Sequence, residues 1–163
     1  KKVTILRLNA APVSGWAWGD YGLTKPGAVS LDFAKWQEAL DNNDPGRLVR
    51  LFVHEIGHAY NSDRGAMPGY WRDFLDLYQR EGRFSEYGKD PIETWAEVLG
   101  YYVARCAKDN PYDKGHGAYY EFVKNRVFDG VTFGPEPGSR VDCSTDPKPA
   151  KRPALPKWWA PVR

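Results

Sequence analysis

Apolar residues recur at three- and four-residue spacing in several stretches of the chain, and this spacing predicts helices. Asp44 suits an N-cap and Pro45 the first position of a helix, so we expect a helix to begin there. Its expected buried stripe follows the same spacing and contains Leu48, Val49, Phe52, Val53, Ile56 and Tyr60. We therefore expect this helix to be a core element.

Four more stretches of the sequence indicate further helices. Asp90-Pro91 repeats the pattern of a helix start, and the apolar positions that follow are Ile92, Trp95, Ala96, Leu99, Val103 and Cys106. Residues 70–81 form another helical pattern that Gly82 is suited to close. Shorter patterns predict helices over residues 32–40 and 119–127.

Strand-like patterns lie in the N-terminal part of the chain. Residues 3–8 and 27–32 are strand candidates, and the Gly- and Trp-rich residues 14–22 suit hairpin strands or a loop. We expect an α+β fold, with a small N-terminal mixed sheet followed by helices. Residues 1–130 would form one domain, and residues 131–163 a Pro-rich C-terminal extension.

Composition limits the function classes. A chain of 163 residues with 42% hydrophobic residues can build one sizeable core. The formal charge of +2 gives no reason to expect nucleic acid as a partner. No run of apolar residues is long enough to predict membrane insertion. Because the chain starts at Lys1-Lys2, we expect a mature or trimmed product, and we expect it to be a monomer.

The segment His54-Glu55-Ile56-Gly57-His58 places two imidazoles one helical turn apart with a carboxylate beside the first. On a helix, both histidines can face one metal ion while Glu55 reaches the water bound to it. This is the HExxH pattern of zinc peptidases, and it predicts one Zn²⁺ per chain. The alternative is a pair of ordinary surface or core histidines without a metal.

A catalytic zinc site of this kind needs a third protein ligand, and Glu93 is the best candidate. Glu93, Glu97, Gly100 and Ala104 line one strip of the predicted helix, where two small residues suit close approach to another helix. Glu97 can accept a hydrogen bond from the nitrogen of a zinc histidine that does not bind the metal. The alternative is that Glu93 only forms a capping box with Asp90 and that Glu97 is solvated.

These motifs together resemble a known family. His54, Glu55 and His58, followed by Tyr87-Gly88 and then by Glu93-Thr94-Trp95-Ala96-Glu97, are similar to the gluzincin metallopeptidases of the anthrax toxin lethal factor type, which include secreted Pro-Pro endopeptidases. The resemblance implies a zincin-like fold, Glu93 as third ligand, Glu97 behind the metal site, and Tyr87 as the phenol that supports the reaction intermediate. It also implies that residues 27–32 are an edge strand holding extended substrate.

Tyr60, Tyr70 and Tyr101 remain competitors for the role of Tyr87. The expected activity is hydrolysis of peptide bonds, most simply as an endopeptidase, through a zinc-bound water with Glu55 as general base. The partner would be a peptide or protein substrate. Two alternatives stay open: an inactive zincin-like binding or interaction protein, and a zinc hydrolase that acts on a non-peptide bond.

Two cysteines bear on the compartment of the protein. In a secreted, extracellular protein we expect Cys106 and Cys143 to form a disulfide that ties the Pro-rich extension to the catalytic half. In the cytosol both would stay reduced, and Cys106 would act as a small hydrophobic residue. The Pro-rich end suits a linker, a partner-binding segment or a tail that folds over the cleft.

Overall fold

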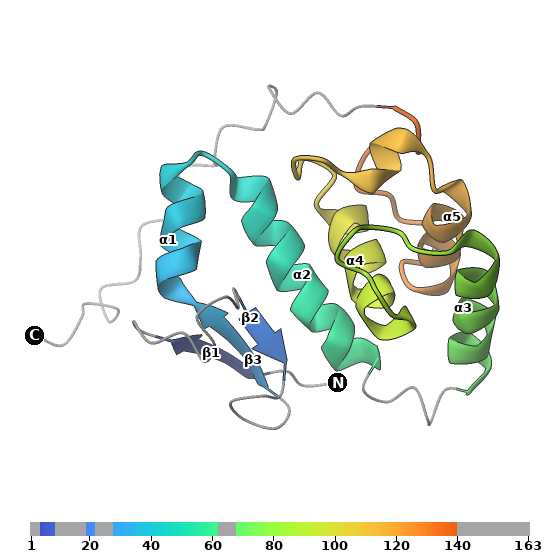
Figure 1. Ribbon diagram of the computed structural model, residues 1–163, viewed down its shortest axis with the longest axis horizontal. Coiled ribbons are helices and arrows are strands. Elements are labelled where there is room, and N and C mark those ends of the chain that lie inside the picture. Colours follow the sequence, from blue (N-terminus) through green and yellow to red (C-terminus); the bar gives the residue numbers. More distant parts are fainter. Residues whose placement is uncertain (1–3, 9–18, 22–27, 62–67, 140–163) are drawn as a thin grey trace, which may run out of the picture.

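The computed structural model describes residues 4–8, 19–21, 28–61 and 68–139. Most of these residues are helical, and a small sheet lies beside the helices (Figure 1). The sheet has the strand order β1 (Thr4–Leu8), β3 (Ala28–Asp32), β2 (Gly19–Tyr21). Strand β1 pairs with β3 in parallel, and β2 pairs with β3 in antiparallel orientation.

Strand β3 is therefore the middle strand of this sheet, and the expectation that residues 27–32 form an edge strand is wrong. The register places Ile5 opposite Val29 and Asp20 opposite Ser30, so β3 has a neighbour on each side. Val29 is fully buried, which fits a central position. Its backbone groups pair within the sheet and are not available to an extended substrate.

Helices α1 (Phe33–Asp41) and α2 (Pro45–Asn61) follow the sheet directly. Asp44 accepts a hydrogen bond from the backbone N–H of Arg47 at 3.2 Å, as its predicted N-cap role requires. Helix α2 packs against α1 and the sheet on one side and against α4 (Pro91–Val103) on the other (Figure 1). It is the central element that joins the two halves of the fold.

The buried face of α2 differs from the predicted apolar stripe. Leu48 is buried as expected, but Val49, Ile56 and Tyr60 are exposed. Their places in the interior are taken by residues on the other side of the helix: Leu51, His54, Glu55, Gly57 and Ala59. The reason is that α2 also buries polar residues such as His54 against α4, so apolar spacing identified only part of the buried face, namely Leu48 and the partly buried Val53.

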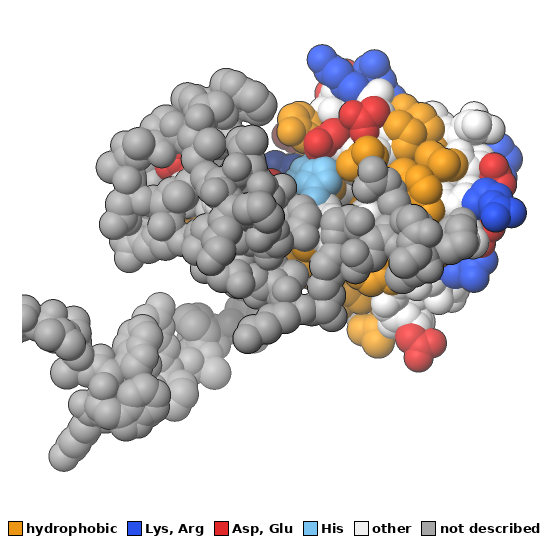
Figure 2. All heavy atoms as spheres, turned by 90° about the horizontal axis from the view of Figure 1, so that it is seen from below, with side chains coloured by type: hydrophobic (Ala, Val, Ile, Leu, Met, Phe, Trp, Pro, Cys, Tyr) orange, Lys and Arg blue, Asp and Glu red, His pale blue; other side chains and the backbone are white. Residues whose placement is uncertain are grey.

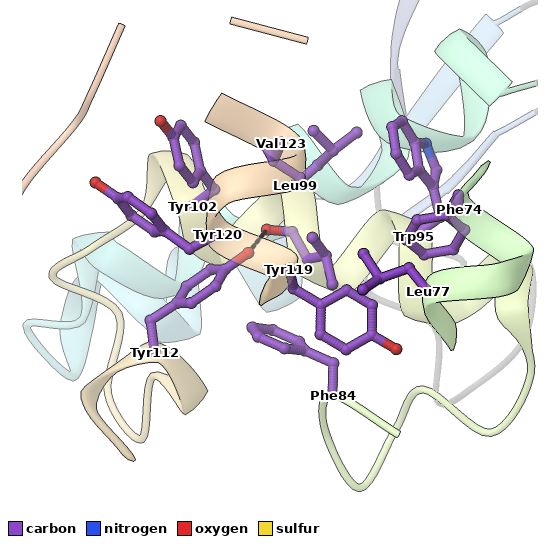
Figure 3. Close-up of a cluster of buried hydrophobic side chains, with 11 residues drawn as sticks. Phe74, Leu77, Phe84, Trp95, Leu99, Tyr102, Tyr112, Tyr119, Tyr120 and Val123 are labelled. Carbon is purple, nitrogen blue, oxygen red and sulfur yellow. Dashed lines mark hydrogen bonds between the residues drawn. The ribbon is translucent and has the colours of Figure 1, made fainter. Parts of the chain in front are cut away.

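The helical half contains α3 (Pro68–Glu81), α4, the short 3-10 helix η1 (Pro111–Lys114) and α5 (Gly117–Arg126). Gly82, with φ of 72°, ends α3 and donates its N–H to the carbonyl of Tyr78. Aromatic rings fill the core between these helices (Figure 3). One buried phenol, that of Tyr112, donates to the carbonyl of Val98 at 3.2 Å.

The chain after α5 returns over the end of α4 without forming a helix. Tyr102 donates its hydroxyl to the carbonyl of Val131 at 2.7 Å, and the N–H of Gly138 donates to the carbonyl of Tyr112 at 2.8 Å. Arg105, which is buried, lies under Gly134 and donates to the carbonyl of Ser139 at 3.3 Å. Residues 131–139 thus pack on the helical half.

Candidate metal centre

Helix α2 brings the two histidines of the motif together. His54 and His58 lie one turn apart, and their Nε2 atoms are 3.1 Å from each other. Their rings meet edge to face with centroids 4.7 Å apart. His54 is buried and His58 is partly buried. The two nitrogens therefore face one point at the surface of α2, as the i, i+4 spacing predicts.

Helix α4 supplies the third polar atom. The Oε2 atom of Glu93 lies 3.3 Å from Nε2 of His54 and 3.5 Å from Nε2 of His58. Asp90 does cap the helix, since it accepts hydrogen bonds from the backbone N–H groups of Ile92 and Glu93. The Glu93 side chain nevertheless points at the histidines, so the capping-box alternative does not describe it fully.

His54, His58 and Glu93 form a group that could hold a metal ion. Ligand atoms that sit ~2.0–2.1 Å from one zinc ion at tetrahedral angles lie about 3.3 Å from each other. The three separations of 3.1, 3.3 and 3.5 Å match that spacing. In addition, Oε2 of Glu93 is a buried atom that makes no hydrogen bond. Two imidazoles and one carboxylate with such an unpaired oxygen fit a divalent cation.

Glu97 fixes the ring of His54. Its Oε1 atom lies 3.0 Å from Nδ1 of His54, and Glu97 is almost completely buried. An ionised carboxylate only accepts hydrogen bonds, so Nδ1 carries a proton, and the neutral ring that a metal binds would offer its lone pair at Nε2. The prediction that Glu97 stands behind the metal site thus agrees with this geometry, and the solvated alternative is wrong.

The charges of this group shift its pKa values strongly. Burial lowers the pKa of His54, but the close carboxylates of Glu93 and Glu97 outweigh it and raise that pKa to about 9. The facing imidazoles of His54 and His58 in turn lower the pKa of Glu93 to about 2. Burial raises the pKa of Glu97, while His54 and Arg50 lower it, with a net lowering. The carboxylates therefore stay ionised and favour positive charge between the rings.

Two further residues of this network were missed in the sequence. Arg50 donates from Nη1 to Oε1 of Glu97 at 2.6 Å, and Ser85 donates from Oγ to Oε2 of Glu97 at 3.0 Å. Arg50 lies one turn before His54 on α2, so the helix period was a usable signal for it. Ser85 lies in the loop between α3 and α4, and no local pattern in the sequence indicates its contact with Glu97.

Small residues on both helices allow α2 and α4 to come close. A Cβ atom on Gly57 would lie 3.1 Å from Cα of Ala96, so these two helices touch through their backbones. The indole N–H of Trp95 donates to the carbonyl of Gly57 at 3.1 Å, next to His58. The close contact brings the ligand atoms of Glu93 and the histidines within reach of each other.

A cavity of about 690 Å³ opens beside the metal group. His54, Glu55, Tyr87 and Glu97 line it, together with Arg50. Glu55 is buried and is one of the residues that line this cavity. In Figure 2 a histidine reaches the surface beside acidic and apolar side chains. The cavity is large enough for part of a peptide.

Tyr87 lies closer to the metal group than its predicted competitors. Its ring centroid is 5.8 Å from that of His54, and about half of the residue is exposed. Tyr60 and Tyr70 instead pack on Trp95, while the Tyr101 ring lies under the guanidinium of Arg50. Partial burial and the nearby carboxylates raise the pKa of Tyr87, so its phenol is protonated and can donate.

The predicted disulfide reaches beyond the described residues. Cys106 lies just after the end of α4 and is exposed, which differs from its expected place in the buried stripe of that helix. Helix α4 ends at Val103, before the stripe reaches position 106. Cys143 lies outside the described part of the chain, so the pairing of the two cysteines stays a prediction.

The comparisons with known proteins add no relative to this picture: the chain matches no protein-family model, no curated protein and no solved structure. Within residues 4–8, 19–21, 28–61 and 68–139, no helix combines the length and the apolar character that crossing a membrane requires. The geometry of the site is therefore what supports a function.

Proposed function

We propose that this protein is a zinc-dependent metallopeptidase in which His54, His58 and Glu93 bind one Zn²⁺ per chain. The observation that carries the proposal is the convergence of two Nε2 atoms and one buried carboxylate oxygen that makes no hydrogen bond. A purely structural zinc site has four protein ligands, whereas three ligands leave a position open for catalysis. The buried Glu55 beside the group supports a catalytic role.

Bound zinc would supply a Lewis acid that polarises the carbonyl group under attack and makes water a nucleophile near neutral pH. The carboxylate of Glu55 takes a proton from water as the water oxygen bonds to the carbonyl carbon. When the C–N bond breaks, Glu55 gives this proton to the leaving nitrogen and is regenerated. The hydroxyl of Tyr87 donates a hydrogen bond to the oxygen on which negative charge develops.

The proposal also covers the type of peptidase, its substrate and its place of action. The spacing of His54, Glu55, His58, Tyr87, Glu93 and Glu97 resembles gluzincins of the lethal factor type, and a small sheet beside a histidine-bearing helix is compatible with a zincin-like fold. We propose a peptide or protein as substrate and an exported, extracellular site of action. The cavity beside Glu55 supports a substrate that approaches from that side.

The test is the zinc content of purified wild type and three variants. Wild type is expected to hold one zinc per chain, and Glu93→Ala to lose it. Glu97→Ala removes the acceptor shared by His54, Arg50 and Ser85 but none of the proposed ligands, so zinc affinity is expected to fall by about 10–100-fold. Glu121→Ala is the matched control, because Glu121 is exposed on α5 and far along the chain from the site. Wild type without zinc after incubation with the metal would overturn the proposal.

A second measurement separates a peptidase from the two alternatives. Zinc-loaded wild type is incubated with a diverse peptide library, and the products are identified by mass spectrometry. Cleavage that disappears on chelation supports the peptidase. Full zinc binding without cleavage of any peptide would overturn the peptidase and leave a binding protein or a hydrolase of another bond.

A further inference from the structure

The turn that carries Tyr87 is attached to α4 at Gly88. The N–H of Gly88 donates to Oγ of Ser85 at 3.1 Å, and Thr94 donates its hydroxyl to the carbonyl of Gly88 at 3.1 Å. Gly88 is buried, and a Cβ atom there would lie 2.9 Å from Oγ1 of Thr94. Both backbone polar groups of Gly88 are thus bound, which fixes the residue next to Tyr87.

The same turn is also attached to the metal group. The hydroxyl of Ser85 donates to Oε2 of Glu97, while the other oxygen of Glu97 accepts from His54 and Arg50. Ser85 therefore uses its hydroxyl in both ways, as an acceptor for Gly88 and as a donor to Glu97. One continuous chain of hydrogen bonds runs from the ring of His54 through Glu97 and Ser85 to the Tyr87 turn.

We propose that Ser85 is a positioning residue that holds the phenol of Tyr87 beside the metal group through Glu97 and Gly88. The inference rests on the proposed function, since it concerns the placement of Tyr87 for the same reaction. Tyr87 is half exposed and makes no hydrogen bond with its hydroxyl among the described residues, so its own side chain does not fix it. The backbone of the neighbouring Gly88 fixes the position of Tyr87 instead, and Ser85 connects Gly88 to Glu97.

The variant Ser85→Ala separates positioning from metal binding. It leaves the N–H of Gly88 and Oε2 of Glu97 without their partner, while Arg50 still holds Oε1 of Glu97 toward His54. We expect one zinc per chain to remain. Hydrogen exchange, measured by mass spectrometry on peptides covering residues 84–90, is expected to become about fivefold faster or more, because a protecting hydrogen bond is lost.

On turnover we expect kcat to fall by about 10- to 100-fold with little change in KM, because the hydroxyl of Ser85 is already engaged by Glu97 and Gly88. Ser85→Thr keeps the hydroxyl, so this variant is expected to have the kcat of wild type and the same slow hydrogen exchange at residues 84–90. Ser139→Ala is the control, since Ser139 is an exposed serine away from the cavity. A loss of zinc in Ser85→Ala equal to that in Glu93→Ala would overturn the positioning role.

A double-mutant cycle with Tyr87→Phe decides whether Ser85 acts through the phenol. If it does, Ser85→Ala lowers kcat in wild type but changes it little in the Tyr87→Phe protein. Equal fold-losses in both backgrounds would overturn the proposal. The exchange measurement keeps the inference separate from the peptidase proposal: unchanged exchange at residues 84–90 in Ser85→Ala overturns it even if the protein cleaves peptides, and faster exchange supports it even if no substrate is found.

Discussion

A Cβ atom placed on Gly100 would lie 2.9 Å from the backbone oxygen of Arg50, so α4 and α2 meet there with room for little more than a hydrogen. The same atom would lie 3.5 Å from Cβ of His54. Gly100→Ala must therefore push the helices apart. We expect a loss of about 1–3 kcal/mol in the free energy of unfolding, despite the better helix propensity of alanine, and weaker zinc binding.

Urea unfolding and a zinc competition titration would measure both effects of this change. The control is Gly69→Ala in α3, where a new Cβ would meet nothing within 4 Å. This control is expected to be unchanged or slightly more stable. Equal stability of the Gly100 variant and wild type would show that α2 and α4 can separate without cost.

Glu55→Gln keeps the size of a buried side chain but removes the carboxylate that takes the proton. Zinc content is expected to stay at the wild-type level, and kcat to fall by about 10²–10⁴-fold. Glu86→Gln is the matched control, because Glu86 lines the same cavity and is exposed. Peptide cleavage assays on all three proteins test this, and a Glu55→Gln protein with near-normal turnover would contradict the role of Glu55.

Asn110 is fully buried and satisfies the carbonyl groups at the end of α4. Its Nδ2 donates to the carbonyls of Tyr101, Ala104 and Arg105, and its Oδ1 accepts from the N–H of Tyr112. Asn110→Ala leaves these buried groups unpaired, so we expect a loss of about 2–4 kcal/mol in the free energy of unfolding.

The comparison for Asn110 is Asn125→Ala on α5, an exposed asparagine that also donates from Nδ2. Its expected effect is within about 0.5 kcal/mol. Urea unfolding of both variants measures the loss in the free energy of unfolding. Similar small losses in the two would mean that water replaces the hydrogen bonds of Asn110.

His116 makes stability depend on pH. Burial against Phe84 and Tyr119 lowers the pKa of His116, and the nearby charge of Glu81 opposes this shift only in part. The unfolded chain thus binds the proton more readily than the folded one. The contribution of His116 to stability is present above the unfolded pKa of ~6.5 and is lost as pH falls through the folded pKa.

The test compares wild type with His116→Asn, because asparagine tolerates the positive φ of 60° at this position. Urea unfolding is measured with a chelator at about pH 7.5 and about pH 5.5, on either side of the ordinary histidine pKa. Wild type is expected to lose more stability than the variant between these values. His54 is present in both proteins, so its opposite contribution cancels. An equal loss would contradict the prediction.

Helix boundaries were largely predictable because their signals are local. Asp44-Pro45 and Asp90-Pro91 mark the starts of α2 and α4, and Gly82 marks the end of α3. A cap needs only a side chain within reach of the next few N–H groups, so it can be found in a single stretch of sequence. The facing of His54 and His58 was predictable for a similar reason, since a helix fixes the distance between them.

The features that could not be predicted depend on contacts between distant parts of the chain. Val49 and Ile56 have apolar side chains at the right spacing, yet they are exposed because α2 buries Glu55 and His54 instead. Ser85 lies 12 positions before Glu97 in a loop, and only the folded chain places its hydroxyl on that carboxylate. No sequence period describes a contact of this kind.

The return of residues 131–139 over α4 and η1 determines how short a folding unit can be. These residues supply carbonyl oxygens to Tyr102 and to the buried Arg105. A chain that stopped at residue 130 would leave both donors without these acceptors and would uncover the aromatic core beneath them. The smallest autonomous unit that contains the helices of the metal group should therefore extend at least to Ser139.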